Sequence, residues 1–120
     1  MEVTLYDGRG KPVAYIAADK ENSIYTWNGH AIAYITEDKV YSWKGRHLGW
    51  FIDGVIFDRQ GYRVGSIAKR CPYSTYTQPA KYAKHVKYAK NAKYAASAKP
   101  ALRVTYGRTQ LIDFLNNSVV

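Results

Sequence analysis

Apolar and polar positions follow one pattern four times over between residues 5 and 67. Each copy has a central glycine, with an aliphatic residue five positions before it, an aromatic residue next and a short polar residue after that. An aliphatic, a very small and a large apolar residue stand three, four and six positions after the glycine. The aligned glycines are Gly10, Gly29, Gly45 and Gly61. Agreement at this many positions in four copies indicates an internal repeat.

The spacing between the aligned glycines is 19, 16 and 16 residues. A unit of this length holds two strands of about five residues and two turns, and no helix of useful length. Asn28-Gly29, in the second copy, is the preferred pair for a two-residue hairpin loop. Turn-forming residues such as Asp53-Gly54 separate the copies. We therefore predict an all-β fold, with four repeated β-hairpins in a pseudo-four-fold meander of about eight strands.

One position of the repeat holds only very small residues, which are Ala14, Ala33, Gly49 and Gly65. A single hairpin is marginally stable in water, so each copy must bury its apolar face against its neighbours. The small residues predict a place where the four copies crowd together near a pseudo-four-fold axis.

Four copies of this aliphatic–aromatic–polar–x–x–Gly–x–x–aliphatic–small pattern resemble the four-fold β-flower family, small bacterial domains in which four hairpin petals surround a centre. The segment from Tyr41 to Phe51 is the nearest match, and the resemblance covers roughly residues 3–70. It implies the hairpin fold described above. It implies no activity and no catalytic residue, and it leaves the C-terminal part of the chain unassigned.

Residues 81–99 contain a second, simpler repeat with a period of six. Alanine and lysine favour a helix, but six residues of helix advance by about 600° and would turn successive tyrosines in different directions. In an extended chain, six residues return to the same face. We therefore favour an extended basic C-terminal segment lying on the hairpin body, with a helix as the alternative. One side of the extended segment would hold Tyr82, Val86, Tyr88, Ala92 and Tyr94.

Two roles are open for this segment. Its six lysines, with no acid among them, would neutralise phosphates, and the interleaved tyrosines would stack on exposed bases. Alternatively the segment is structural, with its tyrosines covering the hairpin body and its lysines solvated. The candidate polyanion-binding residues are Lys81, Tyr82, Lys84, Lys87, Tyr88, Lys90, Lys93, Tyr94 and Lys99.

Beyond Pro100, residues 101–106 alternate like a strand, and Thr109 is suited to cap a short helix that carries Leu111 and Phe114. Both elements are expected to pack on the hairpins. The predicted organisation is a four-hairpin β-repeat domain at 1–70, a Lys/Tyr/Ala-rich extended segment at 71–100, and a C-terminal strand and short helix at 101–120.

The net charge of +9 belongs mainly to the C-terminal part. Residues 71–120 hold eight Lys/Arg and one acid, a balance of +7, whereas residues 1–70 hold ten Lys/Arg and eight acids, a balance of +2.

A chain of 120 residues has room for one modest core. No apolar run is long enough for a transmembrane helix, and the N-terminus does not resemble a secretory signal. Because a single cysteine, Cys71, fits a reducing compartment, we expect a cytoplasmic location.

Candidate catalytic chemistry is sparse. The three histidines are scattered, and Asp7 and Asp58 stand beside turn glycines, where aspartate normally bonds backbone amides. No phosphate-binding loop, nucleophile elbow or paired-cysteine motif occurs. We predict no enzymatic activity, no cofactor and no metal site.

Trp27 and Trp43 are the most site-like residues. They occupy the same repeat position near the hairpin tips. We favour packing against the hairpin edge for both, with a stacking platform for a sugar or a base as the functional alternative. We therefore predict a non-catalytic binding or assembly module, with nucleic-acid or other polyanion binding through residues 81–99 as the alternative. The partners in view are a polyanion, a protein partner or further copies of the same chain.

Overall fold

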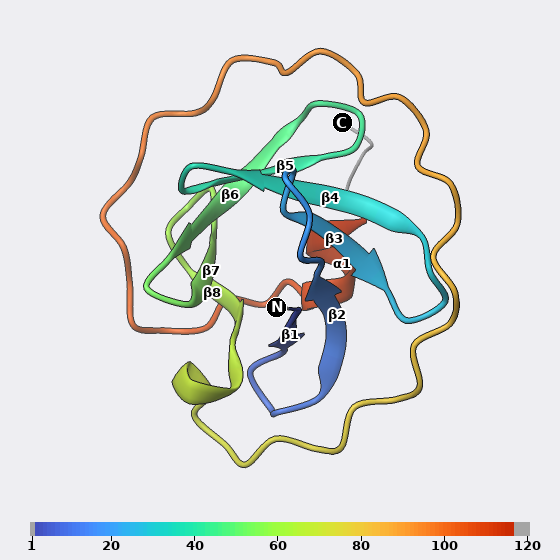
Figure 1. Ribbon diagram of the computed structural model, residues 1–120. Coiled ribbons are helices and arrows are strands. Elements are labelled where there is room, and N and C mark those ends of the chain that lie inside the picture. The colour runs from blue at the N-terminus through green and yellow to red at the C-terminus, as the bar shows by residue number, and fades with distance from the viewer. Residues whose placement is uncertain (1, 117–120) are drawn as a thin grey trace.

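Each of the four repeats forms one β-hairpin in the computed structural model, which describes residues 2–116 (Figure 1). Consecutive hairpins pair edge to edge, and Tyr6 of the first strand pairs with Ser66 of the last, so that the eight antiparallel strands close into a barrel. The predicted all-β fold of four hairpins is confirmed. The strands are β1 (Val3–Tyr6), β2 (Pro12–Ile16), β3 (Ser23–Thr26), β4 (Ala31–Thr36), β5 (Lys39–Ser42), β6 (His47–Ile52), β7 (Val55–Asp58) and β8 (Arg63–Ser66).

The hairpin tips are longer than the two-residue loop predicted at Asn28-Gly29. The Gly29 N–H donates to the Thr26 carbonyl at 3.0 Å, and Asn28 keeps a negative φ, so only the glycine has a positive φ, of 94°. This is a type I turn followed by a left-handed glycine, with a bulge in the adjoining strand pair. Both residues of Asp53-Gly54, between the third and fourth hairpins, do have positive φ.

Short polar side chains explain why the tips close in this way. The Asp7 carboxylate accepts hydrogen bonds from the Arg9 and Lys11 amides at 2.9 and 3.0 Å. Asp58 does the same for two amides of the fourth tip. These bonds satisfy amides that the turn leaves unpaired, which confirms the turn-bonding role predicted for both aspartates.

Aliphatic side chains fill the barrel, and α1 (Leu111–Leu115) completes its core. Leu111, Phe114 and Leu115 are buried in this core. A Cβ on Gly65 would lie 2.7 Å from the Leu111 side chain, and one on Gly49 would lie 3.0 Å from the Phe114 ring. The small positions are therefore crowded as predicted, and at these two glycines the crowding comes partly from the helix rather than from the four copies meeting each other.

The long segment between the barrel and α1 encircles the hairpins, as the yellow-to-orange trace in Figure 1 shows. We call residues 71–110 the belt; it follows a short 3₁₀ turn, η1 (Ala68–Arg70). The belt is extended, as favoured over a helix, and it passes the four hairpin tips in order. At each tip, one belt N–H donates to the glycine carbonyl at 2.9 to 3.0 Å. The donor–acceptor pairs are Tyr76–Gly10, His85–Gly29, Tyr94–Gly45 and Arg103–Gly61.

The belt bonds to successive hairpin tips every nine residues, a spacing that we call the docking pitch. Small and basic residues recur in the belt at this nine-residue spacing, although the six-residue repeat is the more obvious one in the sequence. Two residues before each donor, a belt carbonyl occupies the space where a side chain on the tip glycine would begin. The residues that supply this carbonyl are small, namely Ser74, Ala83, Ala92 and Ala101. Seven positions after each of them stands a basic residue, namely Lys81, Lys90, Lys99 and Arg108.

Two details of the predicted C-terminal part are wrong. Residues 101–106 form no strand; the sole pairing described there is an isolated bridge between Tyr106 and Arg63. The alternation of apolar and polar residues there instead reflects docking of the belt, in which single residues bond to the hairpin and no continuous strand ladder forms. The predicted short helix is present, but its N-cap is Gln110, without a side-chain hydrogen bond, and not Thr109. The predicted region extends to residue 120, and residues 117–120 lie outside the described part of the chain.

The tip glycines provide a direct stability test of the belt contact. Gly45 and Gly54 both have positive φ, so alanine at either should cost about 1–2 kcal/mol of unfolding free energy. At Gly45 the new Cβ would also overlap the Ala92 backbone carbonyl, whereas at Gly54 it would meet side-chain atoms alone, those of Ile67 and Arg70, which can move aside. We expect Gly45→Ala to destabilise the protein more than Gly54→Ala, by at least about 1 kcal/mol in chemical denaturation. Equal losses would show that the belt does not constrain the tip.

Candidate binding surface on the belt

The belt lysines turn toward the barrel rather than toward solvent. Lys81 and Lys84 reach the two carboxylate oxygens of Glu2 at 2.6 and 2.8 Å. Lys99 approaches Asp38 at 3.9 Å. The acids that receive these lysines stand at the start of β1 and in the loops between hairpins. The basic belt and the more acidic hairpin body thus neutralise each other at their contact.

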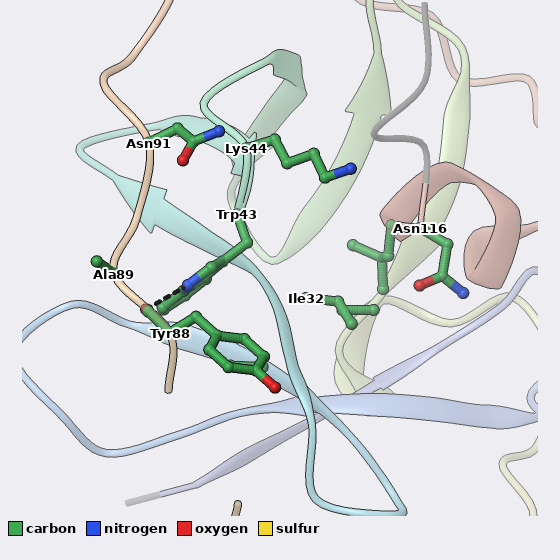
Figure 2. A pocket seen from close by; sticks show the side chains of 9 residues that line it. Ile32, Trp43, Lys44, Tyr88, Ala89, Asn91 and Asn116 are labelled. Carbon is green, nitrogen blue, oxygen red and sulfur yellow. Dashed lines mark hydrogen bonds between the residues drawn. The ribbon is translucent and has the colours of Figure 1, made fainter. Parts of the chain in front are cut away.

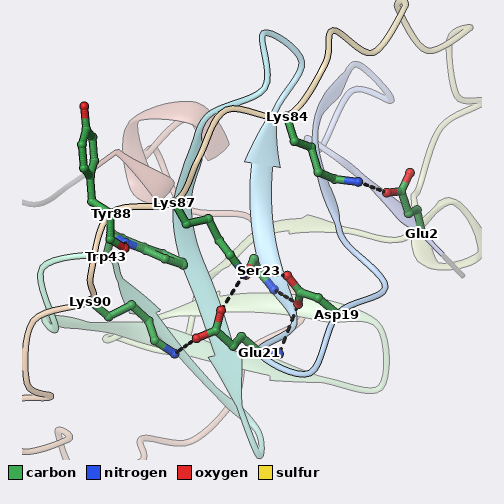
Figure 3. A network of polar contacts seen from close by, with 9 residues as sticks. All are labelled: Glu2, Asp19, Glu21, Ser23, Trp43, Lys84, Lys87, Tyr88 and Lys90. Atoms are coloured by element: carbon green, nitrogen blue, oxygen red, sulfur yellow. Dashed lines mark hydrogen bonds and ion pairs between the residues drawn. The ribbon is translucent and has the colours of Figure 1, made fainter.

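The densest part of this contact lies between the first and second hairpins (Figure 3). The Lys87 ammonium donates to Asp19 at 3.0 Å, to Glu21 at 2.6 Å and to the Ser23 hydroxyl at 3.3 Å. Lys90 pairs with the second oxygen of Glu21 at 2.9 Å. Side chains in this network are about one-third exposed, so the pairs form a linked network rather than isolated surface contacts.

Aromatic rings on the outside of the barrel provide a second set of partners for the same lysines. The Lys81 ammonium lies 4.7 Å from the centre of the Tyr15 ring, and Lys90 lies 4.2 Å from that of Tyr34. Lys93, which forms no ion pair within residues 2–116, lies 5.9 Å from the Tyr41 ring. Such cation–π contacts stabilise a cation that is partly removed from water. The lysines therefore help to hold the belt in place.

The tyrosines of the six-residue repeat point the other way, into solvent. Tyr82, Tyr88 and Tyr94 are 67%, 85% and 59% exposed. The structural alternative for this segment, with tyrosines on the body and lysines solvated, is therefore wrong in its orientation. The reason is that the aliphatic surface of the hairpins faces the barrel interior, leaving carboxylates and ring faces beneath the belt, and these suit lysine better than tyrosine.

The ion pairs change the protonation of the acids that make them. Burial acts to raise the pKa of Asp19, but hydrogen bonds from the Ser23 amide and from Lys87 outweigh it and lower the pKa from 3.8 to about 2. Hydrogen bonds from Lys87 and Lys90 likewise lower the pKa of Glu21. Both carboxylates are therefore ionised throughout the neutral range.

The two candidate tryptophans have different surroundings. Trp27 packs 5.3 Å from the Tyr15 ring, and its Nε1–H donates to the Pro12 carbonyl at 3.3 Å. Trp43 meets Tyr34 edge-on at 5.7 Å, and its Nε1–H donates to the Tyr88 carbonyl at 2.7 Å. The indoles thus join separate aromatic clusters. Trp27 belongs to the packing of the first two hairpins, whereas Trp43 is fixed against the belt.

A groove of 330 Å³ lies beside Trp43 (Figure 2). Its apolar walls include the Trp43 indole, the Tyr88 side chain, Ile32 and Leu115. Its polar lining residues are Lys44, Asn91 and Asn116. Because these residues come from the second and third hairpins, the belt and the end of α1, the groove exists only when all of these parts are assembled. The flat rings offer stacking, and the amides both donate and accept hydrogen bonds. Sequence spacing could not have brought Asn91 and Asn116 to Trp43.

The histidines serve the belt contact in two different ways. His30 and His85 stack ring on ring, with centroids 4.1 Å apart. His47 is buried, and its Nδ1 accepts a hydrogen bond from the Ser97 amide at 3.0 Å. Burial lowers the pKa of His47, which favours the neutral ring that this bond requires. Within residues 2–116 no three His, Cys, Asp or Glu side chains gather in an arrangement that would hold a metal ion.

Comparison with known proteins identifies a family but no individual relative. A family model described as "4-fold beta flower protein" matches residues 3–115, so the match includes the belt and α1 as well as the hairpins. No curated protein and no solved structure matches the chain. None of the described helices is long and apolar enough to cross a membrane.

The Lys87 network predicts how stability depends on pH. Because the folded-state pKa values of Asp19 and Glu21 are lowered, their contribution is fully present above the ordinary values of 3.8 and 4.5. It declines as the pH falls through the lowered values, which for Asp19 is about 2. Replacing Lys87 by glutamine should therefore cost about 1 kcal/mol at pH 7 and clearly less at pH 2, measured by urea unfolding. Lys20→Gln, in the same loop but without an ion pair in the described chain, is the control. A Lys87→Gln effect independent of pH would contradict the network.

Proposed function

This chain belongs to the 4-fold beta flower family, and from that premise we propose that it is a non-catalytic binding module. Its ligand-contacting surface is the outer side of the belt, centred on the groove beside Trp43. The orientation of the belt carries this proposal: its lysines point inward to the barrel, and the tyrosines of its six-residue repeat point outward. Exposed aromatic side chains in a row are characteristic of surfaces that bind partners.

The groove suits a ligand with a flat apolar face and polar groups at its edge, and a sugar ring fits this description best. The Trp43 indole is held by its bond to the Tyr88 carbonyl, so its orientation is set before any ligand binds. Asn91 and Asn116 would bond hydroxyl groups at the edge of a ring stacked on the indole. A preformed stacking face of this kind lowers the entropy that binding must offset.

The acids of the hairpins support a non-catalytic role. Asp7 and Asp58 are committed to amides of their own turns, and Asp19 and Glu21 to belt lysines. A carboxylate that is already bonded to structural partners in this way is poorly placed for proton transfer. The lone cysteine, Cys71, is consistent with a reducing compartment, and we propose the cytoplasm as the location.

Polyanion binding through residues 81–99 is the competing proposal. It requires the lysines to leave Glu2, Asp19 and Glu21, and phosphate contacts would then have to replace ion pairs already made. The exposed tyrosines could still stack on single-stranded bases. The two proposals differ in salt dependence, because stacking on a neutral sugar releases few counterions.

Two exposed belt tyrosines provide a matched test. Tyr88 lines the groove and Tyr82 does not, yet both are largely exposed and belong to the same segment. A glycan screen on the full chain would supply the best-bound oligosaccharide for titration. We expect Tyr88→Ala to weaken its binding roughly tenfold, as loss of one stacking contact implies, and Tyr82→Ala by less than about twofold. The full chain is needed because residues 1–70 alone lack Leu111, Phe114 and Leu115, which belong to the barrel core.

The same preparations would be titrated with a thymidine 20-mer. Binding that falls steeply with salt, and that Lys84→Gln and Lys93→Gln weaken more than Tyr88→Ala does, would replace the sugar proposal with the polyanion one. Equal sugar affinities of the Tyr82→Ala and Tyr88→Ala proteins would show that the sugar does not bind in the groove beside Trp43.

A further inference from the structure

Three arginines line a small pocket at the fourth hairpin, away from the Trp43 groove. The pocket has a volume of 260 Å³, and Arg63 of β8, Arg70 of η1 and Arg103 of the belt line it. One acid, Asp53, also lines it. The remaining walls are apolar, from the barrel strands and from the belt, and include Phe57 and Leu102.

Each guanidinium is anchored through its inner nitrogen. The Nε–H of Arg63 donates to the Arg103 carbonyl at 3.2 Å, and that of Arg70 donates to the Asp53 carbonyl at 2.9 Å. Arg103 is held more loosely, with its Nε 3.5 Å from the Gln60 carbonyl and its guanidinium 4.5 Å from the Tyr62 ring centre. Anchoring at Nε leaves the outer nitrogens of each fork available and reduces the freedom that they would lose on binding.

These arginines differ from the belt lysines in lacking acidic partners. None of the three forms an ion pair within residues 2–116, whereas five of the six belt lysines do. Three cations with one nearby carboxylate leave an excess of positive charge at the pocket. A carboxylate or phosphate entering it would meet guanidinium forks, which match the geometry of both groups.

We propose that this pocket, which we call the arginine pocket, binds a small organic oxyanion, a phosphate or carboxylate attached to an apolar group. The arginines would hold the oxyanion, and Val55, Phe57, Leu102 and Val104 would contact the apolar part. The volume suits a ligand of about the size of an aryl phosphate rather than a polymer chain. This site is additional to the proposed sugar-binding groove and does not depend on it.

The probes for this proposal are phenyl phosphate, benzoate and, as the neutral analogue, phenol. In ¹⁵N-labelled full-length protein, the Arg63, Arg70 and Arg103 Nε–H signals would be followed during titration with each probe. We expect saturable shifts at these signals with at least one anion and none with phenol. Phenyl phosphate binding more tightly would identify a phosphate ligand, and benzoate binding more tightly a carboxylate ligand. No saturable shift with either anion, or equal shifts with phenol, would overturn the proposal.

Arg70 and Lys69 supply a charge-matched pair of variants. Both belong to η1, but Lys69 does not line the pocket. We expect Arg70→Gln to weaken binding of the better anion at least fivefold and Lys69→Gln less than twofold. Arg70→Lys keeps the positive charge but not the guanidinium fork, so its loss of affinity should lie between those of Arg70→Gln and Lys69→Gln. It replaces Arg70→Gln in the comparison if that variant does not fold. Equal losses of affinity in Lys69→Gln and Arg70→Gln would show that the anion responds to the general positive potential of this surface and not to a specific site, which would contradict the proposal. Shifts of the Trp43 signals, with no shift of the arginine Nε–H signals, would place the anion in the Trp43 groove and overturn the proposal.

Discussion

Two backbone contacts between the belt and the hairpin tips hold the whole structure in register. At each tip the glycine carbonyl accepts one belt amide, and a belt carbonyl lies against the glycine where a side chain would otherwise be. The tip glycine is therefore required twice, once for its positive φ in the turn and once for the close approach of the belt. Four repetitions of this contact, at a pitch of nine residues, place the belt around the barrel and bring α1 to its core.

The charge distribution follows from that docking. The hairpins hold nearly all the acids and the belt holds much of the excess base, and the docked belt pairs the two. Part of the positive charge that remains unpaired lies at the fourth hairpin, where Arg63, Arg70 and Arg103 have no acidic partner in the described chain. Most of the belt lysines, which are the candidates for polyanion binding, are thus engaged by acids of the hairpin body. The exposed tyrosines, the Trp43 groove and the arginine pocket are the surfaces left for partners.

Most of the barrel could be predicted from the sequence, because strands, turns and small positions are local properties repeated four times. The belt was predicted to be extended, but its orientation was not, since the six-residue repeat of lysine and tyrosine obscures the nine-residue docking pitch. That pitch depends on the distance between neighbouring tips, which only the closed barrel defines. The groove residues Asn91 and Asn116 are likewise brought to Trp43 by the belt and α1. The alternation of apolar and polar residues at 101–106 suggested a strand. Docking of single residues on a hairpin and ladder pairing between strands produce similar patterns in a sequence.

Amide hydrogen exchange across the belt measures the docking contact directly. The amides of Tyr76, His85, Tyr94 and Arg103 each have a tip carbonyl as acceptor, and Tyr82 and Asn91 donate to the carbonyls of Trp27 and Trp43. Protection at these amides, recurring every nine residues and separated by fast-exchanging neighbours such as Thr77 and Val86, is the result that the structure predicts. Uniformly fast exchange from residue 72 to residue 105 would contradict it, because the belt would then not be docked on the hairpin tips.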